Sequence, residues 1–257
     1  MTKPSTTNSA RFEYLLRHAD DRLVLGHRLS EWCGHGPILE EDIALANISL
    51  DLIGQANLLL ERAGELEGKG RSADDLAFHR DEIDFRNALL VEQPNGDFAM
   101  TMARQFLFDV FSVEVLERLS DSKDETLAGV AAKALKEDRY HLRHSREWVL
   151  RMGDGTEESH GRIQRAFDDL WTYTAELCAM DDVDRALLEQ GIGVDLDPVR
   201  EQWTSSVNAT LEEATLTVPP ADQYMTTGGR EGKHSEHLGH MLAVMQVLPR
   251  SHPDAKW

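Results

Sequence analysis

The stretch IALANISLDLIGQANLLL, residues 43–60, is apolar on nearly every side of a helix and contains no proline. Its spacing of leucine and isoleucine predicts a long α-helix from about residue 40 to 65. A helix that is apolar all round is typically covered by neighbours on most sides. We therefore expect a central helix of a helical bundle here.

The flanking sequence divides into further helical stretches, separated by clusters of glycine and proline and without strand-like alternation. Ser72 with Asp75 has capping-box spacing, Asp97 is a good N-cap, and Asp197 followed by Pro198 is typical of a helix start. The expected helices cover about residues 11–32, 73–79, 98–119, 125–152, 159–180, 182–190, from 197 onward, and 235–247, with an irregular segment at 217–233.

The four long helices should form two hairpins, joined by a segment of about thirty residues. Such a crossover resembles the ferritin-like arrangement. The expected fold class is therefore all-α, a ferritin-like four-helix bundle with two helical hairpins, a long crossover and additional C-terminal helices. We expect residues 1–257 to form a single domain, with the polar residues 1–10 disordered.

The composition excludes several classes of partner. With 27 Lys and Arg against 46 Asp and Glu, the formal charge is −19, which repels nucleic acid and anionic lipid alike. Cys33 and Cys178 are the only cysteines, so no disulfide framework or Cys-x-x-Cys site is indicated. No signal peptide and no bilayer-length apolar run is apparent, so we expect no membrane association and a cytoplasmic protein.

The stretch KEDRYHLRH, residues 136–144, nearly spells half of a di-iron site. Two-iron bundles take a Glu from each of two helices and Glu-x-x-His from each of the other two, because i and i+3 side chains point the same way. The apolar stripe of this helix passes over Asp138 and His141, with Glu137 at its edge, whereas Tyr140 falls off that face. Asp138 or Glu137 with His141 could thus supply half a site.

The matching half is absent from the helix at 40–65. It contains no histidine, and three residues after Asp51 stands Gly54, which offers no side chain. Asn47 and Gln55 are weak ligands for iron, because they are neutral amides. We expect Asp51, Glu137, Asp138 and His141 to be a vestigial site that forms a hydrogen-bonded network, paired with Arg139, with Lys136 or with one another through His141. A single-metal or surviving two-metal site is the alternative.

A second cluster, residues 234–240, contains His237-x-x-His240 and Glu236-x-x-x-His240 after a glycine-rich loop. Because the histidines open a helix, capping and interface hydrogen bonds are the favoured interpretation, with metal binding as an alternative. A third is an anionic ligand held by the helix N-terminus with Arg230 or Lys233. Elsewhere we find no nucleophile elbow, phosphate loop or dinucleotide fingerprint.

Five stretches carry a family resemblance, in preserved order and spacing over nearly the whole chain. The stretches are LVLGHRLSEWCGHGP, EEDIALANISLDLIGQA, LLVEQPNGDFA, KEDRYHLRHSREW and GGREGKHSEHLGHMLAVMQ. They look like the C subunit of the bacterial phenylacetyl-CoA epoxidase. The resemblance implies no catalytic residue, cofactor or metal in this chain.

In that family a ferritin-like A subunit carries the di-iron site that epoxidises the ring of phenylacetyl-CoA. The C subunit is its non-catalytic structural partner, and a small B subunit and a reductase with FAD and an iron–sulfur centre complete the system. The resemblance thus implies a structural subunit in aerobic phenylacetate degradation that pairs with and stabilises the A subunit. The acyl-CoA could lie near the interface, where Arg230 and Lys233 would contact its phosphates.

An independent di-iron or mono-iron oxidase is the competing hypothesis. It would use Glu137, Asp138 and His141, with or without the 234–240 cluster. Such an enzyme would bind iron and turn over oxygen without any partner.

Overall fold

The computed structural model describes residues 6–220, 222–253 and 255, which hold ten α-helices, four short 3-10 helices and no β-strand. The α-helices are α1 (Thr6–Ser30), α2 (Leu39–Glu67), α3 (Ala73–Phe78), α4 (Leu89–Glu92), α5 (Phe98–Leu119), α6 (Glu125–Gly153), α7 (Glu157–Leu170), α8 (Asp182–Glu189), α9 (Leu196–Glu213) and α10 (Glu236–Ser251). The 3-10 helices cover Glu82–Asp84, Trp171–Tyr173, Ala175–Cys178 and Gly229–Glu231. The all-α prediction is confirmed.

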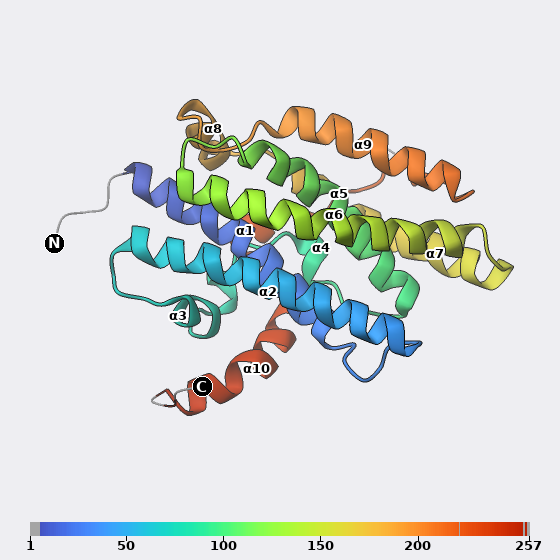
Figure 1. Ribbon diagram of the computed structural model, residues 1–257, viewed down its shortest axis with the longest axis horizontal. Helices are drawn as coiled ribbons and strands as arrows, with labels where there is room; N and C mark the ends of the chain where they lie inside the picture. Colours follow the sequence, from blue (N-terminus) through green and yellow to red (C-terminus); the bar gives the residue numbers. More distant parts are fainter. Residues whose placement is uncertain (1–5, 221, 254, 256–257) are drawn as a thin grey trace.

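Two helical hairpins form the bundle. Helix α1 packs along α2 and helix α5 along α6, and the crossover with α3 and α4 joins the two pairs (Figure 1). The predicted ferritin-like arrangement is confirmed. Helices α7 and α9 pack on α5. Helix α10 leaves the bundle at the lower edge of the view and packs against the crossover. There the Gln246 side chain donates to the carbonyl oxygens of Ala77 and Arg80.

The expected caps are partly correct. Ser72 and Asp75 form the predicted capping box, and Asp97 accepts from the backbone N–H of Met100 at 2.9 Å. Helix α9, however, begins two residues early, because Asp195 rather than Asp197 is its N-cap. Pro198 then lies in the first turn, where its missing N–H would have had no partner within the helix.

The helix predicted at 159–180 is wrong in its second half. Helix α7 ends at Leu170 and two 3-10 helices follow. Threonine hydroxyls compete with the helix here: Thr174 donates to the carbonyl of Trp171, and Thr172 donates to the carbonyl of Tyr224 in the irregular segment. The Thr172 bond ties the chain to a segment distant in sequence, and neither bond continues the α-helix.

Helix ends differ from prediction at both termini. Helix α1 begins at Thr6, so the expected disorder of residues 1–10 is wrong for 6–10, and residues 1–5 lie outside the described part of the chain. It ends at Ser30 rather than 32. Helix α10 continues past 247, through Pro249 to Ser251.

Helix α2 is less covered than its sequence predicts. Its inner side packs into the core through residues that include Leu45, Ile48, Leu52 and Leu59. Only 44% of its most apolar 18-residue window is buried, however. The prediction of neighbours on most sides is therefore wrong, because α1 packs closely along one side of α2 while α3 and α6 contact it less extensively.

Helix α2 is also long and apolar enough to cross a membrane, judged by length and composition alone. The expectation that no run approaches that length is therefore wrong for this helix. The core helix of a bundle passes the same test, and the inner side of α2 is such a core surface.

Candidate functional site

Asp138 and His141 point into the bundle from α6, as their spacing predicts, whereas Tyr140 lies on the outside. Asp138 accepts hydrogen bonds from Gln55 Nε2 at 2.9 Å and from Ser112 Oγ at 2.6 Å. His141 Nε2 lies 3.1 Å from Asp51 Oδ2, and its Nδ1 lies 3.5 Å from Asp138 Oδ1. Side chains from α2, α5 and α6 therefore meet at the predicted place.

Arg22 of α1 supplies the positive charge at this meeting point. Its Nε donates to Gln55 Oε1 at 2.9 Å, and its Nη2 donates to Ser112 Oγ at 2.8 Å. The same Nη2 lies 4.0 Å from Asp138 Oδ2, and both side chains are almost fully buried. A guanidinium thus stands beside the inward carboxylate at the centre of the four helices.

Glu137 and the basic residues of α6 pair differently from prediction. Glu137 accepts from Gln55 Nε2 at 2.9 Å, and Arg139 turns away to Glu117 at 3.0 Å. The expected pairing with Arg139 or Lys136 is therefore wrong, because both basic side chains point outward from the helix. The expected link between Asp51 and Glu137 through His141 is only half made: His141 Nε2 bonds to Asp51, whereas its buried Nδ1, 3.5 Å from Asp138, has no hydrogen-bond partner among the described residues.

A second buried carboxylate, Asp109, lies about one helical turn along α5 from Ser112. It accepts from Gln105 Nε2 at 2.7 Å and from Ser145 Oγ at 2.7 Å. Burial raises the pKa of Asp109 well above its ordinary value, the Ser145 hydrogen bond only partly offsets this, and the charge of Asp138 raises it further. These effects favour a protonated, neutral carboxyl group.

The donor set does not fit two irons. Helix α2 contributes the carboxylate of Asp51 and the amide of Gln55 but no imidazole, and α1 contributes the cation of Arg22. A guanidinium in hydrogen-bond contact with the site repels a divalent ion. Among the residues that the structure describes, no three His, Cys, Asp or Glu side chains converge as metal ligands would.

Three members of this network were not predicted from the sequence: Arg22, Asp109 and Ser112. A signal was present in α5, where Gln105, Asp109 and Ser112 recur at i, i+4 and i+7 in an otherwise apolar helix. Such a polar line on a buried helix predicts inward hydrogen bonds. Metal-ligand spacing alone does not reveal it.

The glycine-rich loop before α10 is shaped by packing. A Cβ on Gly229 would lie 2.2 Å from the carbonyl oxygen of Asn87, so only glycine allows this approach. Arg230 then reaches into the bundle and grips both carboxylate oxygens of Asp21, at 2.9 and 2.8 Å, while also donating to the carbonyls of Arg17 and Arg86. Arg230 therefore anchors the loop to α1.

Of the two residues predicted to contact CoA phosphates, Arg230 belongs to this anchor and Lys233 does not. To bind a phosphate, Arg230 would have to release the fully buried Asp21. Lys233 is exposed and pairs with Glu231 at 2.5 Å. The phosphate contact at Arg230 and Lys233 stays a prediction.

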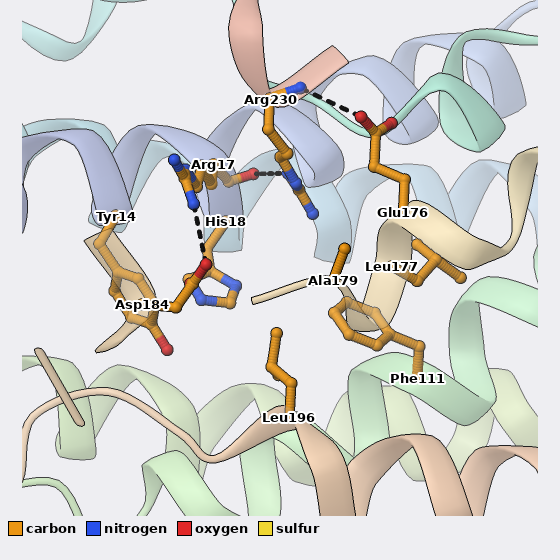
Figure 2. A pocket seen from close by; sticks show the side chains of 10 residues that line it. All are labelled: Tyr14, Arg17, His18, Phe111, Glu176, Leu177, Ala179, Asp184, Leu196 and Arg230. Atoms are coloured by element: carbon orange, nitrogen blue, oxygen red, sulfur yellow. Dashed lines mark hydrogen bonds and ion pairs between the residues drawn. The ribbon is translucent and has the colours of Figure 1, made fainter. Parts of the chain in front are cut away.

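A small enclosed cavity lies next to this anchor, between Arg17, Arg230, Glu176 and Asp184 (Figure 2). It offers about 20 Å³ to the centre of a water-sized sphere, which is room for roughly one water molecule. Burial and the nearby arginines hold the pKa of His18, in its wall, well below the ordinary value. The cavity has no room for an acyl-CoA.

The 234–240 cluster is split in the structure. His234 is buried and its Nδ1 lies 2.8 Å from Glu92 Oε2, while His240 is exposed on α10. Glu92 also accepts from the backbone N–H of Ser235, at 2.6 Å. The favoured interpretation, hydrogen bonding at the start of the helix, is what the geometry shows for His234.

The pair of His234 and Glu92 predicts a pH-dependent stability. Burial opposes a charged imidazole, but the hydrogen bond and charge of Glu92 outweigh it, so the pKa of His234 is raised. A raised pKa stabilises the fold fully below the unfolded value of about 6.5, and this stabilisation is lost as pH rises through the folded value. The free energy of unfolding, measured by urea titrations, should therefore fall as the pH rises above about 6.5.

The variant His234→Gln should lose that component of the pH dependence, and the control His240→Gln should keep it. An unchanged slope in His234→Gln would show that another group causes the pH dependence.

The chain is similar to known proteins over its full length. Its sequence matches the family described as "Phenylacetic acid catabolic protein" over residues 1–257. It is 53% identical over 244 residues to the C subunit of the 1,2-phenylacetyl-CoA epoxidase of Escherichia coli strain K12, covering 95% of this chain and 98% of that protein. A match over this length, at this identity, shows that the chain belongs to the phenylacetic acid catabolic protein family.

Proposed function

We propose that this chain is the C subunit of a phenylacetyl-CoA epoxidase and serves there as a non-catalytic structural partner of a di-iron A subunit. Its place would be aerobic phenylacetate degradation in the cytoplasm, in a complex completed by a small B subunit and a reductase. The similarity to a protein named as the C subunit of such an epoxidase supports the assignment to a multi-subunit complex.

The observation that carries the non-catalytic role is the position of Arg22. Its guanidinium lies 4.0 Å from Asp138 and donates to Gln55 and Ser112, the two side chains that donate to Asp138, at the place where a catalytic bundle would need metal ligands. The hydrogen bonds of this network satisfy the buried carboxylate of Asp138 without a metal ion. The chain thereby keeps the shape of a di-iron bundle, which lets it pair with a related catalytic subunit.

The competing oxidase is disfavoured by the same contacts. Glu137 and Asp138 share the amide of Gln55, and His141 is engaged with Asp51. To bind iron, these side chains would have to break their present hydrogen bonds in the presence of a buried cation.

The test is metal analysis of the chain expressed alone and co-expressed with its A subunit in iron-replete cells. We expect substoichiometric iron and no oxygen-dependent turnover for the chain alone, and a stable complex whose iron accompanies the A subunit. Stoichiometric iron in the chain alone would contradict the non-catalytic role. Failure to co-purify with the A subunit would contradict the partner role.

A further inference from the structure

The outer face of α2 carries an apolar stripe that the described residues leave largely exposed. The exposed members and their exposed fractions are Leu39 (72%), Ile43 (52%), Leu50 (66%) and Ile53 (36%). Positions three, four and seven apart share one side of a helix, so these side chains lie on one line. With Asn57 at its far end the line runs over residues 39–57, or about 27 Å at roughly 1.5 Å per residue.

Gly54 lies on this stripe in the middle of the helix. Glycine weakens a helix interior relative to alanine, so its presence there needs a reason. Within the described chain an added Cβ would meet nothing within 4 Å, whereas the Cβ of Gly229 would collide with a carbonyl. No contact inside the subunit requires Gly54, but a backbone approaching from outside would require it.

Helix α6 adds positive charge beside the stripe. The bonds of Gln55 to Glu137 and of Asp51 to His141 hold α6 antiparallel to α2, and the two helices run side by side across the view in Figure 1. Arg139 also points outward but pairs with Glu117, and the outward cations near the stripe are Lys133, Lys136 and Arg143.

These cations are free in a chain whose net charge is −19. None of the three has a carboxylate partner among the described residues, and the Arg143 guanidinium lies over the exposed Tyr140 ring at 5.3 Å. An acidic protein that leaves three neighbouring cations unpaired beside an apolar stripe presents a surface suited to carboxylates.

We propose that this docking face, formed by Ile43, Leu50, Ile53, Gly54, Lys136 and Arg143, binds a helical partner subunit whose apolar side chains are flanked by carboxylates. The proposal rests on the proposed function, in which that partner is the A subunit. Apolar residues would exclude water at the centre, Gly54 would let a partner helix approach closely, and the α6 cations would pair with acidic residues at the rim.

A second copy of this chain fits the face less well. Between residues 43 and 57 the only carboxylate on α2 is Asp51, and it is bonded to His141. A second copy docking through the same stripe could offer Lys136 and Arg143 only the carboxylates at the two ends of the stripe, Glu40 and Glu61, among the described residues of α2. Two chains at −19 also repel each other. The same net charge opposes an anionic membrane.

The discriminating variant is Gly54→Gln, which should stabilise the isolated chain and weaken the complex. Removing a helix-interior glycine where space is open should raise Tm by about 1–3 °C. A long side chain in the path of a partner helix should weaken binding to the A subunit at least tenfold. The matched control Gly161→Gln, in α7 and with only the flexible end of Arg165 near its Cβ, should leave binding unchanged.

A charge variant tests the rim. Lys136→Glu should slow association with the A subunit and reduce its dependence on salt, because electrostatic attraction acts mainly on the association rate. Size-exclusion chromatography with light scattering, binding kinetics on the full-length chains and flotation with phosphatidylglycerol vesicles provide the measurements.

The outcomes separate the two proposals. A wild-type chain that fails to bind the A subunit overturns the proposed function and this proposal with it. A wild-type complex that Gly54→Gln leaves unchanged overturns the docking face alone. The docking face is also overturned if Gly54→Gln abolishes a homodimer of the wild-type chain, or its binding to the vesicles, while the complex with the A subunit persists.

Discussion

Replacing Arg22 with methionine should lower the free energy of unfolding by about 3–5 kcal/mol, the range for breaking a buried charged pair from one side. The substitution removes the donors to Gln55 and Ser112 and leaves Asp138 without a nearby guanidinium in a site closed to water. Methionine fills a similar volume, so the loss reports charge and hydrogen bonding more than packing. Urea unfolding followed by circular dichroism at neutral pH measures it.

Asp109→Asn is the matched control for Arg22→Met. It lies in the same bundle centre, but its raised pKa favours a neutral carboxyl, so exchanging it for a neutral amide removes no charge pair. We expect the free energy of unfolding to change by less than about 1.5 kcal/mol, the contribution of one ordinary hydrogen bond. If Arg22→Met proved as mild as this control, the network would not depend on its cation.

Arg230→Met should lower the free energy of unfolding by about 3–5 kcal/mol, because it breaks a second buried charged pair from one side. Asp21 is fully buried, and without Arg230 the donor that remains to it among the described residues is the backbone N–H of Ala88, at 2.7 Å. The loop before α10 would also lose its bonds to the carbonyls of Arg17 and Arg86. Urea unfolding again measures the effect.

Adding Asp21→Asn to Arg230→Met should recover part of the stability, because the neutral amide removes the unpaired charge. An additive double variant would contradict the pairing. Lys233→Met, which is exposed, should stay within about 0.5 kcal/mol of wild type. It is therefore the cleaner variant for measuring a KM effect on acyl-CoA in the assembled complex.

The sequence predicted the fold well because helix periodicity and caps are local signals. The four long helices, the crossover and the caps at Ser72 and Asp97 follow from residues within a turn of one another. The break after Leu170 was missed because its cause is remote: Thr172 bonds to Tyr224, 52 residues away. Local spacing carries no information about such a partner.

The candidate site was predicted only on the helix that bears the motif. Asp138 and His141 were placed inward by periodicity, but their partners come from other helices, and Arg22 is 116 positions before Asp138. Which side chain faces which across a bundle depends on the relative rotation and shift of helices, which a single sequence does not state. The exposed side of α2 could not be foreseen either, since composition alone cannot distinguish a core contact from a subunit contact.

The central network also bears on the order of folding. Its members Arg22, Gln55, Ser112 and Asp138 come one from each of the four long helices, and the long crossover separates the first pair from the second. Each hairpin can assemble from contacts close in sequence, but the network closes only when the hairpins have docked. The two bonds that cross between the hairpins, Arg22 to Ser112 and Gln55 to Asp138, should therefore be absent from the folding nucleus and act on the unfolding rate, so that the hairpins separate slowly once they have docked.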